Sequence, residues 1–270
     1  MKAVSTETPQ STADPAGFFD TALAAATEAE RETEIVDRYY RIGRATVRLR
    51  FAGPALIPLV TPAIDHVAEP PTAAPSLTVH VWDTQSTGVP MPPAPWSMEA
   101  VTFRGDVTGF NNGRIFTALQ ADAALLSLLD TESAEAIYWI RDPAHMPSHE
   151  IAAPLLRIFH WWQQQCGNQI VHAAAVGNKH GGVLLAGKSG SGKSGTALAC
   201  LGAGFGYAAD DYCLLSDDPS PTVFSIYNTG KTHERDVERM PYLAPLWEIA
   251  ARRHQRRRSI FFIDIFRKGW

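Results

Sequence analysis

A short segment rich in glycine, lysine and serine has the residue types and the spacing to bind phosphate. Residues 187–194 read Gly-Lys-Ser-Gly-Ser-Gly-Lys-Ser and fit the pattern G-x-x-x-x-G-K-[ST] at every fixed position. A chance match somewhere in a chain of 270 residues is on the order of one in a hundred. Glycines let successive backbone N–H groups point at one phosphate, while Lys193 can reach the β- and γ-phosphates and Ser194 can offer a hydroxyl to Mg²⁺. The expected phosphate-binding residues are Gly187, Lys188, Ser189, Gly190, Ser191, Gly192, Lys193, Ser194 and Gly195.

Two adjacent carboxylates follow this loop. Asp210 and Asp211 lie 17 and 18 residues after Lys193, at the end of a strand-like stretch over 205–209. In phosphoryl transfer one carboxylate can anchor Mg²⁺ and another can accept the proton of an attacking hydroxyl. The residues alone do not decide which aspartate does which. An isolated Asp-Asp pair is more often a solvated turn, but its position after the loop favours the functional interpretation.

The surrounding pattern predicts the elements that would position these groups. An apolar run over 182–186 predicts a buried strand before the loop, and 195–201 predicts a helix after it, whose positive end would add to phosphate binding. The alternative is a Gly/Ser-rich turn with two exposed lysines, which this strand–loop–helix context disfavours. Further predicted elements of this half are a helix over 151–165, a strand over 170–176 and a strand over 259–266.

The front half predicts a different kind of unit. Alternating apolar residues over 47–51 and 77–82 indicate half-buried strands, and Asn111-Asn-Gly113 is a hairpin signal. We expect residues 1–16 to be a disordered tail, 17–150 a smaller α+β domain with a mainly antiparallel sheet, and 151–270 the phosphate-binding α/β domain. Other predicted elements are a helix over 18–40, strands over 100–104, 114–118 and 134–140, and a short helix over 125–129. No catalytic constellation occurs in the front half, so we expect it to dock a substrate or partner, or to serve assembly.

Composition excludes several classes of protein. The net charge is −4 and the pI is about 6.1, which disfavours nucleic acid and anionic membranes as partners. Three cysteines without CxxC spacing argue against a disulfide framework or a zinc site. No apolar run is long enough to span a bilayer and no signal-peptide pattern opens the chain, so a cytoplasmic protein is expected. Five arginines among residues 252–258 are interpreted as a solvated helix end rather than a phosphate or acidic-peptide patch.

The same residues resemble a known family. The loop with its helix start (187–198), a glycine at the helix end and Ala209-Asp-Asp211 look like the core of the HPr kinase/phosphorylase family. The sequence is most similar to the HPr-kinase-like serine kinases encoded with lasso-peptide maturation genes. His172, in Val171-His-Ala-Ala-Ala175, lies 21 residues before Lys193 and matches the family's histidine in type and spacing. The resemblance covers most of residues 40–270, with its sharp motifs around the loop.

The resemblance implies an α/β P-loop kinase domain that uses ATP and Mg²⁺ to phosphorylate a serine of a protein or peptide, a lasso-peptide precursor being one candidate. Carried over residue by residue, Asp211 would accept the proton of the substrate hydroxyl, His172 would lie beside it, and Lys193 would bind the phosphates. Ser194 and Asp210 would hold the metal. Whether the protein forms a homo-oligomer stays open.

The sequence also departs from the family. The glycine-rich stretch that carries a second magnesium carboxylate has no counterpart, which counts against phosphorylase activity and against HPr as substrate. The unranked candidates to replace that carboxylate are Asp217, Asp218, Glu234 and Asp236. Relatives continue beyond the strand at 259–266, so a truncated domain is among our expectations. The alternative function is a nucleotide-binding regulatory or scaffold protein without turnover; a GTPase is disfavoured because N-K-x-D is absent after the loop.

Overall fold

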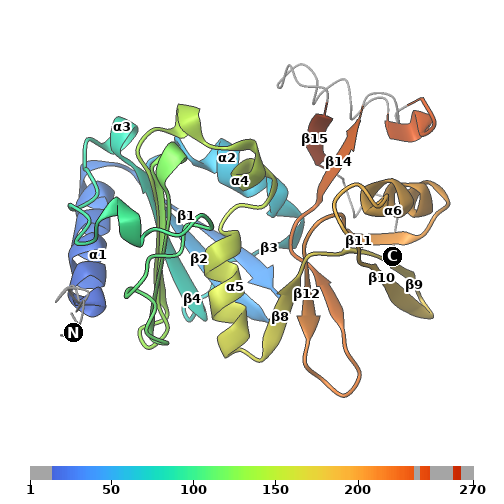
Figure 1. Cartoon of the computed structure of the whole chain (residues 1–270), viewed down its shortest axis with the longest axis horizontal. Coiled ribbons are helices and arrows are strands. Elements are labelled where there is room, and N and C mark those ends of the chain that lie inside the picture. The colour runs from blue at the N-terminus through green and yellow to red at the C-terminus, as the bar shows by residue number, and fades with distance from the viewer. Residues whose placement is uncertain (1–13, 234–237, 244–257, 263–270) are drawn as a thin grey trace, which may run out of the picture.

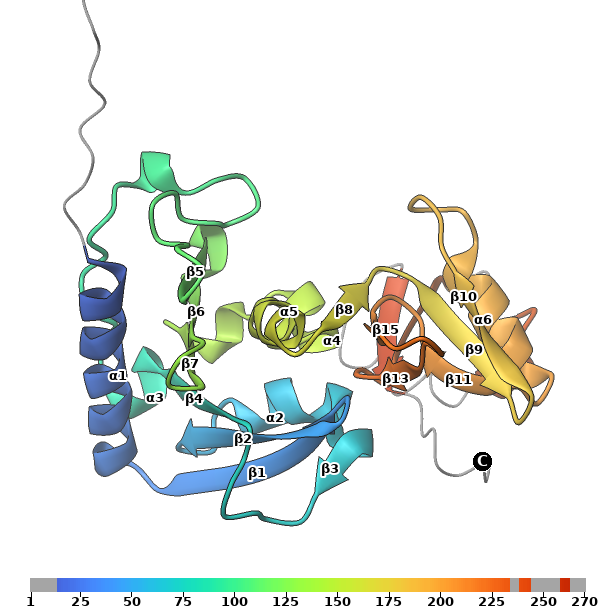
Figure 2. The same cartoon turned by 90° about the horizontal axis from the view of Figure 1, so that it is seen from below.

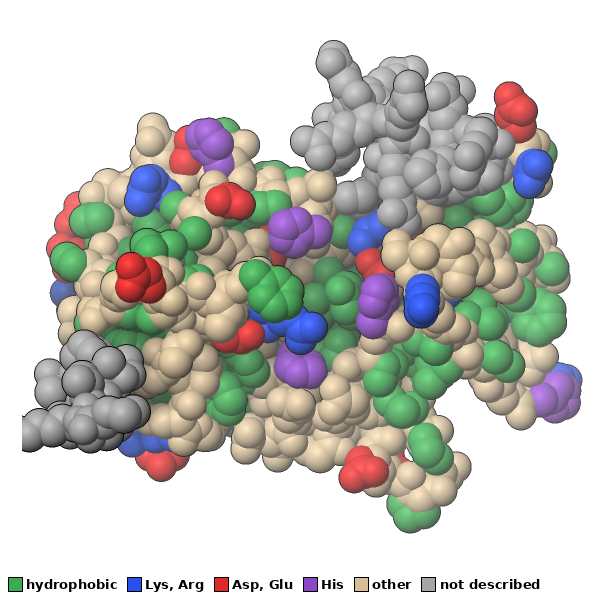
Figure 3. Space-filling model, in the orientation of Figure 1, with side chains coloured by type: hydrophobic (Ala, Val, Ile, Leu, Met, Phe, Trp, Pro, Cys, Tyr) green, Lys and Arg blue, Asp and Glu red, His purple; other side chains and the backbone are tan. Residues whose placement is uncertain are grey.

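The computed structural model describes residues 14–233, 238–243 and 258–262. It has an α/β fold with two parts (Figure 1): a seven-stranded mixed sheet with helices on both faces, and a smaller part built from short antiparallel sheets and one helix. In the space-filling view the two parts meet at a hollow (Figure 3). None of the helices in the described ranges combines the length and the hydrophobicity that crossing a bilayer requires.

The large sheet has the strand order β3-β1-β2-β4-β7-β6-β5. Its central strand β4 pairs in parallel with β2 and β7, and all its other neighbouring strands are antiparallel. The predicted mainly antiparallel sheet is therefore present as a mixed sheet. Its strands are β1 (Ile35–Ile42), β2 (Ala45–Ala52), β3 (Ala68–Glu69), β4 (Leu77–Asp83), β5 (Ile115–Gln120), β6 (Leu125–Asp130) and β7 (Glu135–Ile140).

Helices cover both faces of this sheet. Figure 2 shows α1 (Pro15–Glu32) against one face, with α2 (Ile57–Val60), α4 (Ser148–Ala152) and α5 (Leu156–Gln165) against the other; α3 (Thr84–Thr87) follows β4. Leu126 and Leu128 of β6 pack with the α1 side, whereas Leu125 and Leu129 pack with the α5 side. The predicted helix over 125–129 is wrong, because a strand buried on both faces is apolar at every position and loses its alternation.

Helix α1 begins at Pro15, where the Asp14 Oδ1 accepts a hydrogen bond from the Ala16 N–H at 3.0 Å. The predicted tail over 1–16 therefore extends at least two residues too far, because residues 15 and 16 belong to α1. Residues 1–13 lie outside the described part. The predicted helix over 18–40 is wrong beyond Glu32, because Thr33 is extended and the next residues form β1. Branched and aromatic side chains in that segment gain more from pairing with β2 than from continuing the helix.

Two further predicted elements differ from the structure. Segment 100–104 is not a strand; Val101 makes only an isolated bridge to Val107. The predicted helix over 151–165 is two helices, because Leu155, with φ at +61°, interrupts the backbone between α4 and α5.

The smaller part contains three short sheets with orders β10-β9-β11, β13-β12-β8 and β14-β15. The predicted helix after the loop is α6 (Lys193–Gly202), and the predicted strand over 170–176 is two strands, β8 and β9. The predicted strand over 259–266 is β15 as far as residue 262, and its remainder lies outside the described residues. The strands are β8 (Asn168–Val171), β9 (Ala174–Asn178), β10 (Gly181–Leu185), β11 (Gly206–Ala209), β12 (Cys213–Ser216), β13 (Val223–Ser225), β14 (Thr229–His233) and β15 (Arg258–Phe262).

One hydrophobic core runs from the large sheet into the smaller part. Ile170, Leu214 and Ile226 are buried in the same cluster as Val47 and the helix residue Phe159. Strands β8 and β12 are thereby fixed against the sheet, which holds the segments between the small strands in place.

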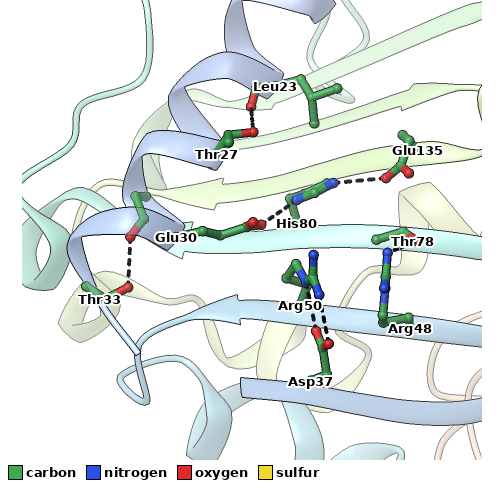
Figure 4. A network of polar contacts seen from close by, with 11 residues as sticks. Leu23, Thr27, Glu30, Thr33, Asp37, Arg48, Arg50, Thr78, His80 and Glu135 are labelled. Atoms are coloured by element: carbon green, nitrogen blue, oxygen red, sulfur yellow. Dashed lines mark hydrogen bonds and ion pairs between the residues drawn. The ribbon is translucent and has the colours of Figure 1, made fainter. Parts of the chain in front are cut away.

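A buried histidine joins α1 to the sheet (Figure 4). The Nδ1 atom of His80 lies 2.5 Å from Glu30 Oε1 on α1, and its Nε2 atom lies 2.9 Å from Glu135 Oε2 on β7. Burial alone would lower the pKa of His80, but hydrogen bonds and attraction to the two carboxylates outweigh burial and raise it to about 9. His80 is therefore charged at neutral pH.

This histidine should make the fold less stable at alkaline pH. Because the folded pKa of His80 is about 9 and the unfolded one about 6.5, its contribution is complete below pH 6.5 and lost as pH rises through 9. We expect the free energy of unfolding to fall by on the order of 3 kcal/mol between about pH 6 and about pH 10, and His80→Gln to remove that slope. Denaturant titration at several pH values measures it.

His66→Gln is the matched control for this experiment. Burial lowers the pKa of His66 to about 4, so it is neutral throughout this pH range and its replacement should leave the slope in place. An unchanged slope in His80→Gln would show that the Glu30–His80–Glu135 contact does not carry a charge in the folded state.

Candidate functional site

The site residues lie where two strands pass from one small sheet into another. Val171 of β8 pairs with Cys213 of β12, whereas Ala175 of β9 pairs with Ala209 of β11. Between these two pairings the segments 172–173 and 210–212 are free of ladder hydrogen bonds and face each other. The predicted site residues His172, Asp210 and Asp211 all lie in this gap, where the backbone does not pair with another strand.

The carboxylate of Asp211 is held from both sides. Its Oδ1 lies 2.6 Å from His172 Nε2 and its Oδ2 lies 2.5 Å from Lys231 Nζ on β14. The ring of His172 stacks on Tyr212, with centroids 5.1 Å apart. The structure thus brings together the histidine and the aspartate that the family resemblance singled out, and adds a lysine.

The electrostatic surroundings keep Asp211 ionised. Burial acts to raise the pKa of this carboxyl, but the hydrogen bond and charge of Lys231, with His172, outweigh burial and lower it. The His172 side chain is 53% exposed, so it links the buried carboxylate to solvent. Asp211 can therefore accept a hydrogen bond from an incoming hydroxyl and orient it.

Asp210 is buried and only partly satisfied. Its Oδ2 accepts a hydrogen bond from the backbone N–H of Lys231 at 2.8 Å, whereas its Oδ1 has no hydrogen-bond partner among the described residues. Burial raises the pKa of this carboxyl, and the nearby Ser194 hydroxyl and the Lys231 N–H act against that shift. A buried carboxylate oxygen without a hydrogen-bond partner is costly, so this oxygen is suited to coordinate a ligand.

Asp210 and Ser194 fit a magnesium ion that is shared with a nucleotide. The unpartnered Oδ1 is a hard oxygen ligand, and the Ser194 hydroxyl at the start of α6 is close enough to the same carboxyl to act on its pKa. Magnesium commonly takes only one or two protein ligands and completes its shell with phosphate and water. No group of three or more His, Cys, Asp or Glu side chains able to hold a metal occurs within the described ranges.

The loop before α6 has the backbone that phosphate binding requires. Gly190 and Gly192 have φ of +82° and +91°, which residues with a side chain rarely adopt. Lys193 Nζ donates to the carbonyl oxygens of Gly187 and Lys188 at 2.8 and 3.3 Å. The lysine therefore lies over its own loop, and its donors can transfer to a phosphate.

The strand before the loop is present but not buried as predicted. Strand β10 lies at the edge of its sheet, and Val183 is 59% exposed. Helix α6 packs its Ala197 and Leu198 against one face of this sheet, beneath Val176 and Tyr207. The other face has no such cover among the described residues, so an apolar run that indicates a buried strand is exposed here.

The candidates for a second magnesium carboxylate are not in the site as described. Asp218 forms an ion pair with Arg44 at 2.6 Å, and Asp217 lines the same shallow pocket near the end of α5. Glu234 and Asp236 lie outside the described residues, as do residues 252–257 of the arginine run.

Lys231 is the site residue that sequence reasoning missed. It contacts both aspartates but lies 20 residues after Asp211 in a stretch without any recognisable motif. The one feature that could have drawn attention to Lys231 is that a single lysine directly follows the stretch Ile226–Gly230, whose residues are buried in the structure.

Comparison with known proteins adds no identity. The sequence matches no protein-family model and no curated protein. The assignment of chemistry to the site therefore depends on the residues and their geometry.

Removal of the loop lysine should weaken nucleotide binding selectively. Lys193→Ala should weaken ATP and ADP by at least about tenfold, because a charged contact to the β- and γ-phosphates is lost, while AMP is unaffected. Lys179→Ala, at an exposed position in the turn between β9 and β10, is the matched control outside the loop and should bind all three nearly as the parent does. Calorimetric titration measures the affinities, and equal ATP affinity in Lys193→Ala would exclude this loop as the phosphate site.

The contact between Lys231 and Asp211 should be measurable as a coupling energy. Both side chains are mostly buried, with 18% and 26% exposed, so the pair is poorly screened. In a double-mutant cycle with Lys231→Met and Asp211→Asn, we expect a coupling of about 1–3 kcal/mol in the free energy of unfolding. Additive effects of the two substitutions would mean that the two groups do not interact in solution.

Proposed function

We propose that this protein is an ATP-dependent kinase of the HPr-kinase-like type, with a P-loop kinase domain that transfers the γ-phosphoryl group to a serine hydroxyl of a protein or peptide. The observation that carries the proposal is that two adjacent carboxyl groups have different surroundings: one is ionised and suited to accept a proton, and the other has an oxygen suited to coordinate a metal. Asp211 is held by His172 and Lys231, and its neighbour Asp210 has one oxygen without a partner and lies near Ser194. The resemblance of the motifs adds a lasso-peptide precursor as a candidate acceptor.

Each group has a distinct role in this proposal. Backbone N–H groups of the loop and the start of α6 bind the phosphates of ATP, and Lys193 exchanges its two carbonyl acceptors for phosphate oxygens. Asp210 and Ser194 would hold Mg²⁺, which supplies positive charge to the phosphates. The carboxylates thereby serve separate tasks although they are adjacent.

In this proposal the γ-phosphoryl group passes directly from ATP to the serine hydroxyl. The serine oxygen forms a bond to the γ-phosphorus while the bond from that phosphorus to the β–γ bridging oxygen breaks, and ADP leaves with that electron pair. The hydroxyl proton passes to the Asp211 carboxylate. Because the pKa of Asp211 is lowered, it is a weak base that orients the hydroxyl first and takes its proton late, as a loose transition state allows.

A second function has one observation in its favour. The ammonium of Lys231 occupies Asp211 Oδ2, and a carboxylate in an ion pair is a poorer proton acceptor. A nucleotide-binding regulatory or scaffold protein without turnover would have no need of a free base at this position. Both functions would use the free oxygen of Asp210 to hold Mg²⁺ with the nucleotide. A measurement of nucleotide binding alone therefore does not distinguish a kinase from a protein without turnover.

Substitution of the two aspartates should separate the two roles. Asp211→Asn keeps the shape but cannot accept a proton, so phosphoryl transfer should fall by about 10²–10⁴-fold while ATP affinity is largely kept. Asp210→Asn should lower the apparent affinity for Mg²⁺, so excess metal should partly restore its rate. The measurement is phosphopeptide formation at several Mg²⁺ concentrations, with Asp217→Asn, an exposed aspartate outside the site, as the control. Normal transfer by both site variants would rule out the proposed roles.

A further inference from the structure

A pocket of about 880 Å³ lies at the edge of the large sheet, beside the end of β5. It lies between the loop 101–105, the start of α4 and the first turn of α5. In Figure 3, histidine and basic side chains gather on both sides of the hollow between the two parts of the molecule. The pocket belongs to the front half and the first helix of the back half, and nothing in the proposed phosphate chemistry uses it.

The pocket is lined by cations whose charges are only weakly neutralised. Arg104 lies over the ring of Phe103 at 5.3 Å, and no ion pair of Arg104 occurs in the described part of the chain. Arg157 donates to the backbone carbonyl of Arg104 and is 3.4 Å from Asp106, a long distance for an ion pair. Both guanidinium groups therefore have donors left for a carboxylate.

The acidic residues of the lining do not cancel this charge. Glu150 is 6% exposed and accepts hydrogen bonds from Tyr138 and Gln120, while burial raises the pKa of its carboxyl. Asp122 is exposed and lies in the turn after β5. Phe103, at 94% exposed, adds an apolar surface beside the arginines.

The pocket is fixed to the strand that carries Lys231. The Thr229 hydroxyl at the start of β14 donates to the Ala152 carbonyl at the end of α4, at 2.9 Å, and the Tyr227 hydroxyl donates to the Pro154 carbonyl at 2.8 Å. Two residues after Thr229, Lys231 contacts Asp211. The wall of the pocket and the acceptor carboxylate are thus parts of one connected structure.

The pocket and the site also pack on one hydrophobic core. Leu156, which lines the pocket beside Arg157, and Tyr212, which follows Asp211 in the chain, both pack against the core of the large sheet. Tyr212 is the residue on which His172 stacks. The α5 side of the pocket and the neighbour of Asp211 are therefore held by the same core.

We propose that this pocket docks an acidic segment of the acceptor peptide, with Arg104 and Arg157 pairing with its carboxylates while the neighbouring serine reaches Asp211. The inference rests on the proposed kinase function and gives its substrate class: a serine flanked by Asp or Glu. An extended peptide suits the pocket because it offers carboxylates for the guanidinium groups and side-chain carbons for Phe103. A nucleic acid is the less fitting occupant, since the protein carries a net charge of −4.

Peptide binding without turnover tests the docking independently of catalysis. Three fluorescein-labelled serine peptides of equal length, flanked by Asp/Glu, by Asn/Gln or by Lys/Arg, are titrated with the full chain, and fluorescence anisotropy is read with and without ADP. A labelled single-stranded DNA oligonucleotide is the fourth probe. We expect the acidic peptide to bind at least about tenfold more tightly than the others, with an affinity that falls as salt is added.

Variants assign the preference to the pocket. Arg104→Gln with Arg157→Gln should abolish the preference, and the single reversal Arg104→Glu, at an exposed position, should reverse it without disturbing the fold. Arg31→Glu, the same change of two charges at a 70% exposed side chain on α1, should change nothing. Equal binding of all peptides, a preference that survives in the double variant, or tighter binding of the oligonucleotide would each overturn the proposal.

The two proposals fail in distinguishable ways. If the acidic peptide binds through the arginines but no phosphopeptide forms with ATP and Mg²⁺, the kinase function fails and the docking of an acidic peptide stands. If serine peptides are phosphorylated at equal kcat/KM whatever their flanking charge, the kinase function stands and the docking role fails.

Discussion

Lys231 binds both carboxylates of the site at once, through its backbone N–H to Asp210 and through its ammonium to Asp211. This double contact fixes the turn between β11 and β12 against β14, where no sheet ladder holds it. It also sets the two carboxyls apart chemically: one is ionised and partnered, and the other is buried with a free oxygen. Loss of the ammonium would leave Asp211 without its lysine partner next to a second carboxyl, and this difference between the two groups would be reduced.

The large sheet contributes to the site through packing. Its core continues into the smaller part through Ile170 and Leu214, which lie on the strands that flank the gap. The hydroxyl groups of Tyr227 and Thr229 join the start of β14 to the end of α4 and the residues that follow it. The gap that contains His172 and Asp211 is thus held in place from both sides.

Local patterns allowed prediction of the loop, of α6 and of the aspartate pair, because each of these signals lies within a short stretch of sequence, whereas His172 was singled out by the family resemblance. Lys231 could not be predicted, since its contacts to the aspartates depend on where β14 lies in space. The strand β6 was missed because burial on both faces removes its alternation, and the end of α1 was missed because β1 is specified by pairing with β2. The exposure of β10 likewise depends on what covers the sheet, which its own sequence does not encode.

The proposed kinase activity is tested most directly by following both products of one reaction. The full chain is incubated with ATP, Mg²⁺ and an acidic serine peptide, and ADP release is compared with the peptide's gain of about 80 Da in mass. Transfer to the serine predicts one ADP for each phosphopeptide. ADP without phosphopeptide would indicate a hydrolase, and bound ATP without either product would indicate a nucleotide-binding protein without turnover; both results contradict the proposed function.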